Sequence, residues 1–253
     1  TRATPPAAAR WRPVLGCWLT VYKRTWRGSL FGRFLSPLMF LLSIGLGLGS
    51  LVDDSAGGVG GVPYLQYVVP GIVAAQAMWV AMGESTYPVM GAIRWNEKYH
   101  AMLATPVGIN DVLLGHLIYV AMQITGATAI FIGVAALFGS FTSWWVLLAW
   151  PVTAATGMAF AVPVFAFAAK QETDGGFNIL LRFIMTPLFL FSGIFFPVDQ
   201  LPALLRPVAW LTPLWHGVEA NRSLALGSPD LAGVAGHTAY LLVVIVVGGW
   251  LAR

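Results

Sequence analysis

Three residues in the second half of the sequence have side chains suited to chemistry. His216 and Glu219 are three positions apart, so a helix would place them on one face. One His and one Glu form an incomplete metal site, because a catalytic metal is generally held by three protein ligands. Ser192 stands in Phe-Ser-Gly, not in the Gly-x-Ser-x-Gly turn of a hydrolase nucleophile. We therefore expect no catalytic residue and no metal site.

The sequence also limits thiol and nucleotide chemistry. Cys17 is the single cysteine, which excludes an internal disulfide. No stretch matches the Gly-x-x-x-x-Gly-Lys-Ser/Thr loop that cradles nucleotide phosphates. We expect the chain to bind no cofactor, so that any ATP hydrolysis requires a separate protein.

The polar segment 94–106 is the main candidate for contact with another protein. It interlaces charged with aromatic and apolar residues, which gives a short helix both a packing surface and charges. A plain solvated loop is the alternative, although the aromatic content argues against it. The candidate contact residues are Arg94, Trp95, Glu97, Lys98, Tyr99, Met102 and Leu103.

Composition indicates that these residues belong to a membrane protein. The 253 residues are 58% hydrophobic and only 9% charged, against about 25% charged residues in soluble domains. Apolar stretches near 20 residues recur along the chain, which is the length of a helix that spans a bilayer. The net charge of +4 comes from Lys and Arg at segment ends rather than from a basic stripe, so nucleic-acid binding is not indicated.

We predict an all-α membrane protein with six transmembrane helices. Residues 1–29 form a cytoplasmic N-terminal segment in which 10–26 is an amphipathic, Trp-rich interfacial helix, and 30–253 form the transmembrane domain. Between spans five and six, prolines cut the apolar sequence into pieces that are too short to span, which predicts broken re-entrant helices. The six predicted spans are 30–51, 64–88, 112–138, 144–168, 178–196 and 235–251.

Basic residues predict the orientation of these spans. Most of them fall on one side, whereas Asp53 and Asp54 occupy the first loop of the other side. By the positive-inside rule, both termini are cytoplasmic. The basic residues of that side are Arg2, Arg10, Arg12, Lys23, Arg24, Arg27, Arg33, Arg94, Lys98, Lys170 and Arg253.

Glu84 lies late in the second predicted span. A charge at full membrane depth costs about 2.5–3.5 kcal/mol on insertion scales and less near the interface. Glu84 therefore contacts the N-terminal helix, forms a polar point in a conduit, or reaches the interface as an ordinary carboxylate. For His116 and Gln123 we expect hydrogen bonds between helices.

Two stretches carry a family resemblance. Residues 187–202 read Pro-Leu-Phe-Leu-Phe-Ser-Gly-Ile-Phe-Phe-Pro-Val-Asp-Gln-Leu-Pro, and Leu-Thr-Pro-Leu-Trp-His and Asn-Arg follow at 211–216 and 221–222. Met-Leu-Ala-Thr-Pro at 102–106 precedes Asp-Val-Leu-Leu-Gly at 111–115. The chain resembles the ABC-2 type permease family, and within it the nodulation-factor (lipo-oligosaccharide) exporters and the daunorubicin-resistance-type drug exporters.

The resemblance implies a transporter of two permeases, usually identical, with two cytoplasmic ATPase subunits that bind ATP and Mg. In such an assembly, segment 94–106 looks like the coupling helix that receives motion from the ATPase. The chain itself would not be an enzyme.

The aromatic residues near the outer end of spans five and six suggest a gate. An interfacial belt explains part of this content, and the sharper hypothesis is an exit gate that excludes water. The candidate residues of the substrate path or gate are Glu84, Phe189, Phe191, Phe195, Phe196, Trp215 and His216.

We therefore expect an ATP-driven exporter permease of the cytoplasmic membrane that moves an amphipathic or lipid-like substrate. An ion-coupled secondary transporter is one alternative, but it would show paired intramembrane acids and inverted repeats. A lipid-modifying enzyme that uses His216 and Glu219 is another. Transport that survives loss of the partner's ATPase activity would favour the first alternative, and export that survives replacement of both residues by Ala would remove the second.

Overall fold

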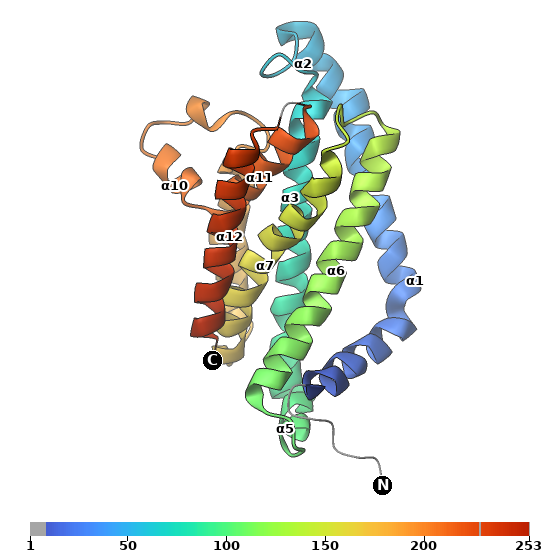
Figure 1. Ribbon diagram of the computed structural model, residues 1–253, viewed down its shortest axis with the longest axis vertical. Coiled ribbons are helices and arrows are strands. Elements are labelled where there is room, and N and C mark those ends of the chain that lie inside the picture. The colour runs from blue at the N-terminus through green and yellow to red at the C-terminus, as the bar shows by residue number, and fades with distance from the viewer. Residues whose placement is uncertain (1–8, 228, 253) are drawn as a thin grey trace.

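The computed structural model describes residues 9–227 and 229–252. Within these ranges the chain forms a bundle of helices, and the extended pairing that it contains is an isolated bridge between Val59 and Val62. Arg2 and Arg253, which entered the orientation count, lie outside the described residues. We name the two ends of the bundle after the short helices found there, the α2 end and the α5 end (Figure 1).

The first helix is continuous where the sequence predicted two elements. α1, Trp11–Ser43, passes through a π-helical turn, Ile44–Leu48, into α2, Gly49–Ala56. The expected interfacial helix and first span are thus one helix, which bends along its length (Figure 1). Trp18 is buried against the bundle and Trp26 is exposed, so the Trp-rich face packs in part on protein.

The second helical run crosses the centre of the bundle and ends at the α5 end. α3, Tyr64–Ser85, breaks at Thr86, and Pro88 occupies the start of the next turn, where its missing N–H leaves no bond unmade. The chain then forms α4, Tyr87–Met90, a π-helical turn, Gly91–Trp95, and α5, Lys98–Leu103.

Two long helices, α6 and α7, complete the centre, and glycines set their distances from their neighbours. On α6, Ile109–Leu137, a Cβ added at Gly115 would lie 2.7 Å from Cβ of Val14 on α1. On α7, Val146–Lys170, a Cβ added at Gly157 would lie 3.0 Å from a backbone oxygen of α3. The absence of side chains at these glycines lets the helices approach closely, as is common in membrane bundles.

The last third of the chain alternates short helices with one long helix. After α7, a shorter helical run returns toward the α2 end. Short helices follow it, and the long helix α12 then runs back along the bundle (Figure 1). These elements are α8 (Gly175–Ile179), a π-helical turn (Leu180–Met185), α9 (Thr186–Phe191), a 3-10 turn (Val198–Gln200), α10 (Arg206–Trp210), α11 (Pro213–Ala225) and α12 (Leu231–Leu251). α11 packs against α3, α7 and α12.

Four helices of the described residues are long and apolar enough to cross a membrane. They match the second, third, fourth and sixth predicted spans. The first predicted span lies within α1 and α2, and the fifth corresponds to the shorter apolar run Gly175–Phe191, so the total of six spans stays a prediction. The short helices expected between spans five and six are present as α10 and α11, whereas their insertion into one leaflet stays a prediction.

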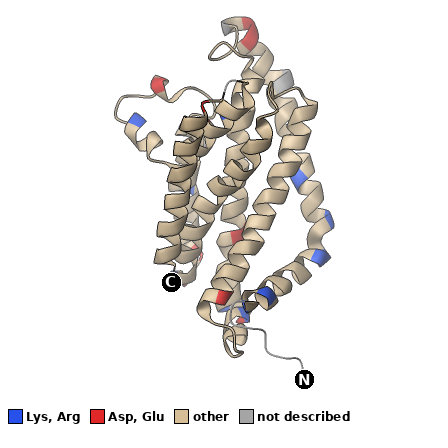
Figure 2. Cartoon of the chain, viewed as in Figure 1, with Lys and Arg blue, Asp and Glu red and all other residues tan. Residues whose placement is uncertain are grey.

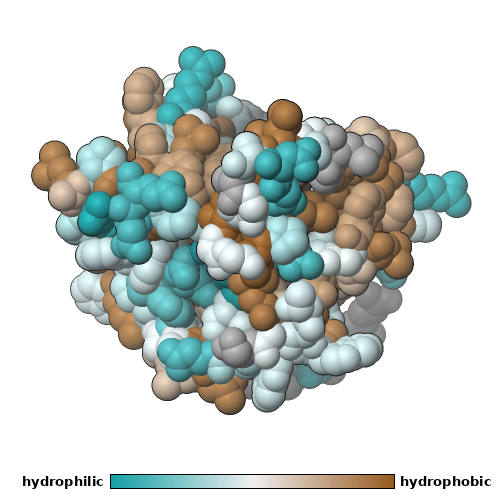
Figure 3. All heavy atoms as spheres, turned by 90° about the horizontal axis from the view of Figure 1, so that it is seen from above, coloured by the Kyte–Doolittle hydropathy of each residue, from teal (hydrophilic) through white to brown (hydrophobic). Residues whose placement is uncertain are grey.

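Charged residues are distributed unevenly over the helices. Lys and Arg follow α1 and cluster near α5, while the lengths of α7 and α12 are almost free of charge (Figure 2). The α2 end, seen from above, presents hydrophilic and hydrophobic residues side by side (Figure 3). This distribution suits a protein whose apolar middle faces lipid and whose ends face headgroups and water.

Candidate functional site

Tyr99 and His116 tie α5 to the interior of the bundle. Oη of Tyr99 lies 2.6 Å from Nδ1 of His116, and Nε2 of His116 lies 3.0 Å from the backbone oxygen of Glu84. Because a carbonyl oxygen only accepts, Nε2 carries the hydrogen, and Nδ1 of the neutral ring accepts the bond that the Tyr99 hydroxyl donates. His116 is fully buried, so this two-bond path joins α5, α6 and α3 inside the bundle.

Trp18 brings α1 into the same region. Its ring meets His116 edge-on with centroids 4.4 Å apart and stacks on Tyr119 at 5.5 Å. Nζ of Lys98 lies 3.5 Å from the Trp18 ring centroid, within the range of a cation–π interaction. Burial lowers the pKa of Lys98, and the neighbouring thiol group of Cys17 opposes that effect.

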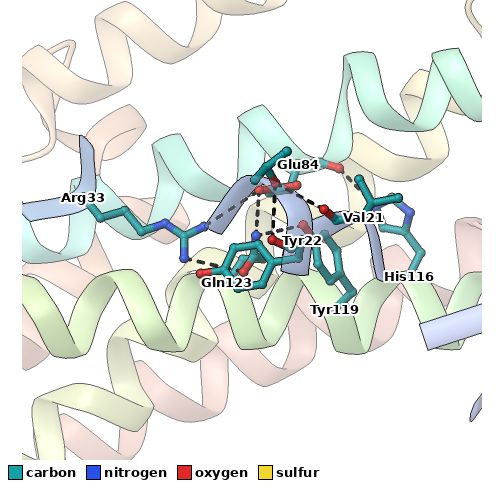
Figure 4. Close-up of polar contacts among 8 residues, drawn as sticks. Val21, Tyr22, Arg33, Glu84, His116, Tyr119 and Gln123 are labelled. Carbon is teal, nitrogen blue, oxygen red and sulfur yellow. Dashed lines mark hydrogen bonds and ion pairs between the residues drawn. The ribbon is translucent and has the colours of Figure 1, made fainter. Parts of the chain in front are cut away.

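A second polar group lies next to this aromatic one (Figure 4). Nε2 of Gln123 donates to Oε1 of Glu84 at 3.3 Å and to Oη of Tyr119 at 2.8 Å. Nη1 of Arg33 donates to Oε1 of Gln123 at 3.5 Å, and its Nη2 lies 4.0 Å from Oε1 of Glu84. The guanidinium group of Arg33 is also 5.7 Å from the ring centroid of Tyr22. Residues of α1, α3 and α6 therefore share one hydrogen-bonded cluster.

This cluster gives Glu84 a partner. Of the three interpretations from the sequence, contact with the N-terminal helix describes the observed geometry, because the cation comes from α1. A paired carboxylate is far less costly inside a membrane than an isolated one. The hydrogen bonds between helices expected of His116 and Gln123 are confirmed.

The candidate contact segment is divided into an anchored part and a free part. Tyr99 is buried and Lys98 and Met102 are half-buried. Trp95 is 62% exposed and Leu103 is 41% exposed, although both are large and apolar. Arg94 and Glu97 are exposed as well. The exposed side chains are the ones available to a partner.

The helix in this segment is shorter than predicted. Arg94 and Trp95 belong to the π-helical turn that ends the preceding run, and Glu97 has a left-handed backbone with φ of 46°. This conformation is sterically unfavourable for a residue other than glycine. The left-handed backbone also interrupts the helical hydrogen-bond pattern. α5 therefore begins only at Lys98.

At the α2 end, Arg222 holds three segments together. Its guanidinium group donates to Oε1 of Glu219 at 2.5 Å, to the backbone oxygen of Gly193 at 2.6 Å and to that of Tyr67 at 3.4 Å. The Tyr67 ring lies 4.0 Å below the cation. The neighbouring Asn221 donates to Oγ1 of Thr153 at 2.7 Å. This part of the sequence signature is thus a buried structural joint of α3, α7 and α11.

The candidate gate residues do not meet at one place. Phe189 contacts Phe195 and Trp79, with ring centroids 5.3 Å and 6.2 Å apart. Phe196 and Trp215 instead pack on the small cluster around Val198. Phe191 is 41% exposed. The structure therefore shows two aromatic groups, and the role of either as a gate stays a prediction.

His216 has a histidine partner that the sequence did not reveal. Its Nδ1 lies 2.8 Å from Nδ1 of His237 on α12, and its ring stacks on Tyr240 with centroids 3.8 Å apart. Glu219 is engaged by Arg222 instead. Among the described residues, no three His, Cys, Asp or Glu side chains are grouped so that they could hold a metal ion.

Comparison with known sequences assigns the family. The profile of the ABC-2 type transporter family matches residues 14–226. The chain belongs to the ABC-2 type transporter family. The region that matches the family profile includes α5 and the Glu84 cluster, whereas His237 lies beyond its end at residue 226.

Individual relatives agree with this ABC-2 assignment. The chain is 35% identical to nodulation protein J of Rhizobium leguminosarum bv. trifolii over 238 residues, 91% of this chain and 88% of the relative. It is 34% identical to nodulation protein J of Rhizobium meliloti (strain 1021), with the same coverage. The inner membrane transport permease YadH of Escherichia coli (strain K12) is 21% identical over 91% of this chain and 87% of YadH.

The sequence analysis did not identify three residues that make these contacts. Arg33 was counted only for orientation, although a cation inside the predicted first span signals a buried partner. His237 likewise lies inside the sixth predicted span. Trp18 was assigned to lipid contact, and no feature of the sequence distinguished a lipid from a protein neighbour for its ring.

Proposed function

We propose that this ABC-2 chain is the membrane subunit of an ATP-driven exporter, which works with a separate ATPase subunit and a second permease copy. The observation that carries this proposal, beyond family membership, is the divided segment at the α5 end. Its exposed Trp95 and Leu103 offer a contact surface, while its buried Tyr99 is bonded to the centre of the bundle.

That arrangement suits the transmission of force. A push on α5 reaches α6 through the Tyr99–His116 bond and α3 through the His116–Glu84 bond. The same push reaches α1 through Lys98 and Trp18. We infer that movement of the ATPase tilts these helices together and alternates access to a path between two permeases, with the differential binding of ATP as the driving energy.

The substrate proposed is amphipathic or lipid-like and moves outward across the cytoplasmic membrane, with both termini of the chain on the cytoplasmic side. Two features support this. Glu84 and Arg33 neutralise each other rather than lining an ion path, and the four apolar helices carry few other charges. A secondary transporter coupled to ions would show paired intramembrane acids, whereas Glu84 faces the cation of Arg33.

Reconstitution tests the proposal. The purified chain and its proposed ATPase partner are placed in proteoliposomes with a fluorescent acylated oligosaccharide on the ATPase side, and the accessibility of the fluorophore to a membrane-impermeant quencher is followed. We expect transfer that requires ATP and is abolished when the Lys of the ATPase's phosphate-binding loop is replaced. Equal transfer by the permease alone under a proton gradient would assign the chain to secondary transport instead.

A further inference from the structure

A large apolar groove opens beside α5. Its volume is about 1040 Å³, at the upper end of the roughly 300–1,000 Å³ of sites for small ligands. One wall is α1, with Val14, Trp18 and Val21. The other wall is the end of the α3–α4 run together with α5, and it includes Ala92 and Met102.

One charged side chain lines this groove. Among the described residues, Lys98 is its only Lys, Arg, Asp or Glu, and none of their carboxylates lies within 4.0 Å of the Lys98 ammonium group. The cation instead rests on the Trp18 ring beside the thiol group of Cys17. A half-buried ammonium group without a counter-ion is unfavourable, and an anion brought into the groove would remove that cost.

The shape and the chemistry of the walls restrict what that anion is. A small soluble anion would satisfy Lys98 but would leave the apolar walls without a partner. A ligand with an anionic head and a hydrocarbon chain satisfies both. The groove also adjoins an exposed apolar surface of the kind that suits lipid contact, because α1 continues from the exposed Val21 into exposed Trp26, Phe31 and Phe34.

The geometry points to a binding site for one anionic phospholipid of the adjacent membrane leaflet, with its phosphate at Lys98 and one acyl chain between α1 and α5. The lipid is a resident of the site and not the cargo. The bound lipid would fill the open space between the two walls of the groove. It would thereby connect the N-terminal half of α1 to segment 94–106. This inference requires neither the ATPase nor transport, so it can fail while the proposed function stands.

Cys17 supplies the probe for a test. It is the single cysteine of the chain and it lines the groove. The full-length protein is purified in detergent micelles doped with phosphatidylglycerol or with phosphatidylcholine of the same acyl chains, and the rate of Cys17 alkylation by a maleimide is measured. We expect phosphatidylglycerol to slow alkylation about fivefold more than phosphatidylcholine, the scale of one partly exposed ion pair.

Variants of Lys98 distinguish binding of the anionic head group from nonspecific protection of Cys17 by any lipid. Lys98→Gln should abolish the difference between the two lipids, and Lys98→Arg should keep it. The matched control is Lys23→Gln, because Lys23 is exposed on the same helix α1 and does not line the groove. It should behave as the parent. Equal protection by the two lipids in the parent protein, or a difference that survives in Lys98→Gln, would overturn the proposal.

Two further measurements complete the test. Native mass spectrometry should detect one retained phosphatidylglycerol on the parent and on Lys98→Arg, and none on Lys98→Gln, whose thermal unfolding is recorded to show that it folds. In proteoliposomes with the ATPase, ATP should leave labelled phosphatidylglycerol in its original leaflet. Its ATP-dependent appearance in the opposite leaflet would make the lipid a cargo and overturn its assignment as a resident.

Discussion

The hydroxyl group of Tyr99 and the imidazole of His116 form a buried hydrogen bond of 2.6 Å between a six-residue helix and a helix long enough to span the membrane. His116 satisfies its other nitrogen on the backbone of α3. Both ring nitrogens are thus used, and the orientation of the ring is fixed. This leaves α5 little freedom to move independently of α6.

The first prediction concerns this bond. Tyr99→Phe keeps the ring and leaves Nδ1 of His116 buried without a donor, which costs about 1–3 kcal/mol. For a domain of this size, that corresponds to a fall in Tm of roughly 2–12 °C, measured on the purified protein by thermal unfolding. Tyr87→Phe is the control, because Tyr87 is 39% exposed and its hydroxyl group has no hydrogen bond in the described residues. Equal Tm values for the two variants would contradict the assigned role of the bond.

The second prediction concerns the exposed residues of segment 94–106, for which we propose contact with the ATPase. Trp95→Ala together with Leu103→Ala should weaken association with the ATPase at least tenfold, because large apolar contacts carry most of the affinity of an interface. The Tm of the permease alone should stay unchanged, since both side chains are exposed. The matched control is Leu204→Ala, whose side chain is 85% exposed near α10. Association is measured by affinity copurification of the two subunits, and parent-level recovery of the double variant would remove these residues from the interface.

Glu84 and Arg33 provide a test of the cluster between α1, α3 and α6. Glu84→Ala removes both the acceptor for Gln123 and the counter-charge for Arg33, so it should destabilise by about 1–3 kcal/mol. Glu84→Gln keeps an acceptor oxygen and should cost less. If the two residues interact as described, Arg33→Ala combined with Glu84→Ala should cost less than the sum of the single changes, with a coupling of about 0.5–3 kcal/mol. Strict additivity of the changes in unfolding free energy would show that the residues act separately.

The close approach of α1 to α6 depends on Gly115. A Cβ at this position would lie 2.7 Å from Cβ of Val14 and 2.9 Å from the backbone oxygen of Trp11, so Gly115→Ala must push the helices apart. Overpacking of this kind costs about 1–3 kcal/mol. Gly133→Ala on the same helix meets no atom within 4 Å and should instead be neutral or gain up to about 1 kcal/mol of helix propensity. Thermal unfolding of both variants tests the contrast, and a loss at Gly133 equal to that at Gly115 would attribute the effect to the helix itself.

The sequence predicted the elements of this fold better than their contacts. Long apolar runs define candidate spans by themselves, which is why the four helices that are long and apolar enough to cross a membrane were placed correctly along the sequence. The basic residues at 23–27 suggested a boundary, but Lys and Arg favour helix, so α1 continues through them. The left-handed backbone of Glu97 was not predictable, because Gly, Asn and Asp favour that conformation and Glu does not.

Contacts between distant helices explain the rest. The sequence indicated that Glu84 needs a partner, but the hydrophobic pattern alone does not say which helix faces it. Its partner Arg33 is 51 positions earlier in the chain. The same limit applies to His216 and His237, whose pairing requires α11 and α12 to lie side by side. The aromatic residues assigned to one gate were grouped by nearness in sequence, and packing divided them.

The last prediction concerns Arg222, which joins α11 to the backbone of α3 and of the loop after α9. Arg222→Lys keeps the charge but cannot reach Glu219, Gly193 and Tyr67 at once, since an ammonium group lacks the planar, forked donors of guanidinium. The change therefore leaves a buried backbone oxygen of Gly193 or Tyr67 without its donor, which costs about 1–3 kcal/mol and should appear as a fall in Tm. The control is Arg24→Lys at an exposed position of α1, which should leave Tm unchanged. Because Arg222 is the cation that compensates Glu219, adding Glu219→Gln to Arg222→Lys should recover part of the loss, and a further fall in Tm would show that Glu219 has a separate structural role.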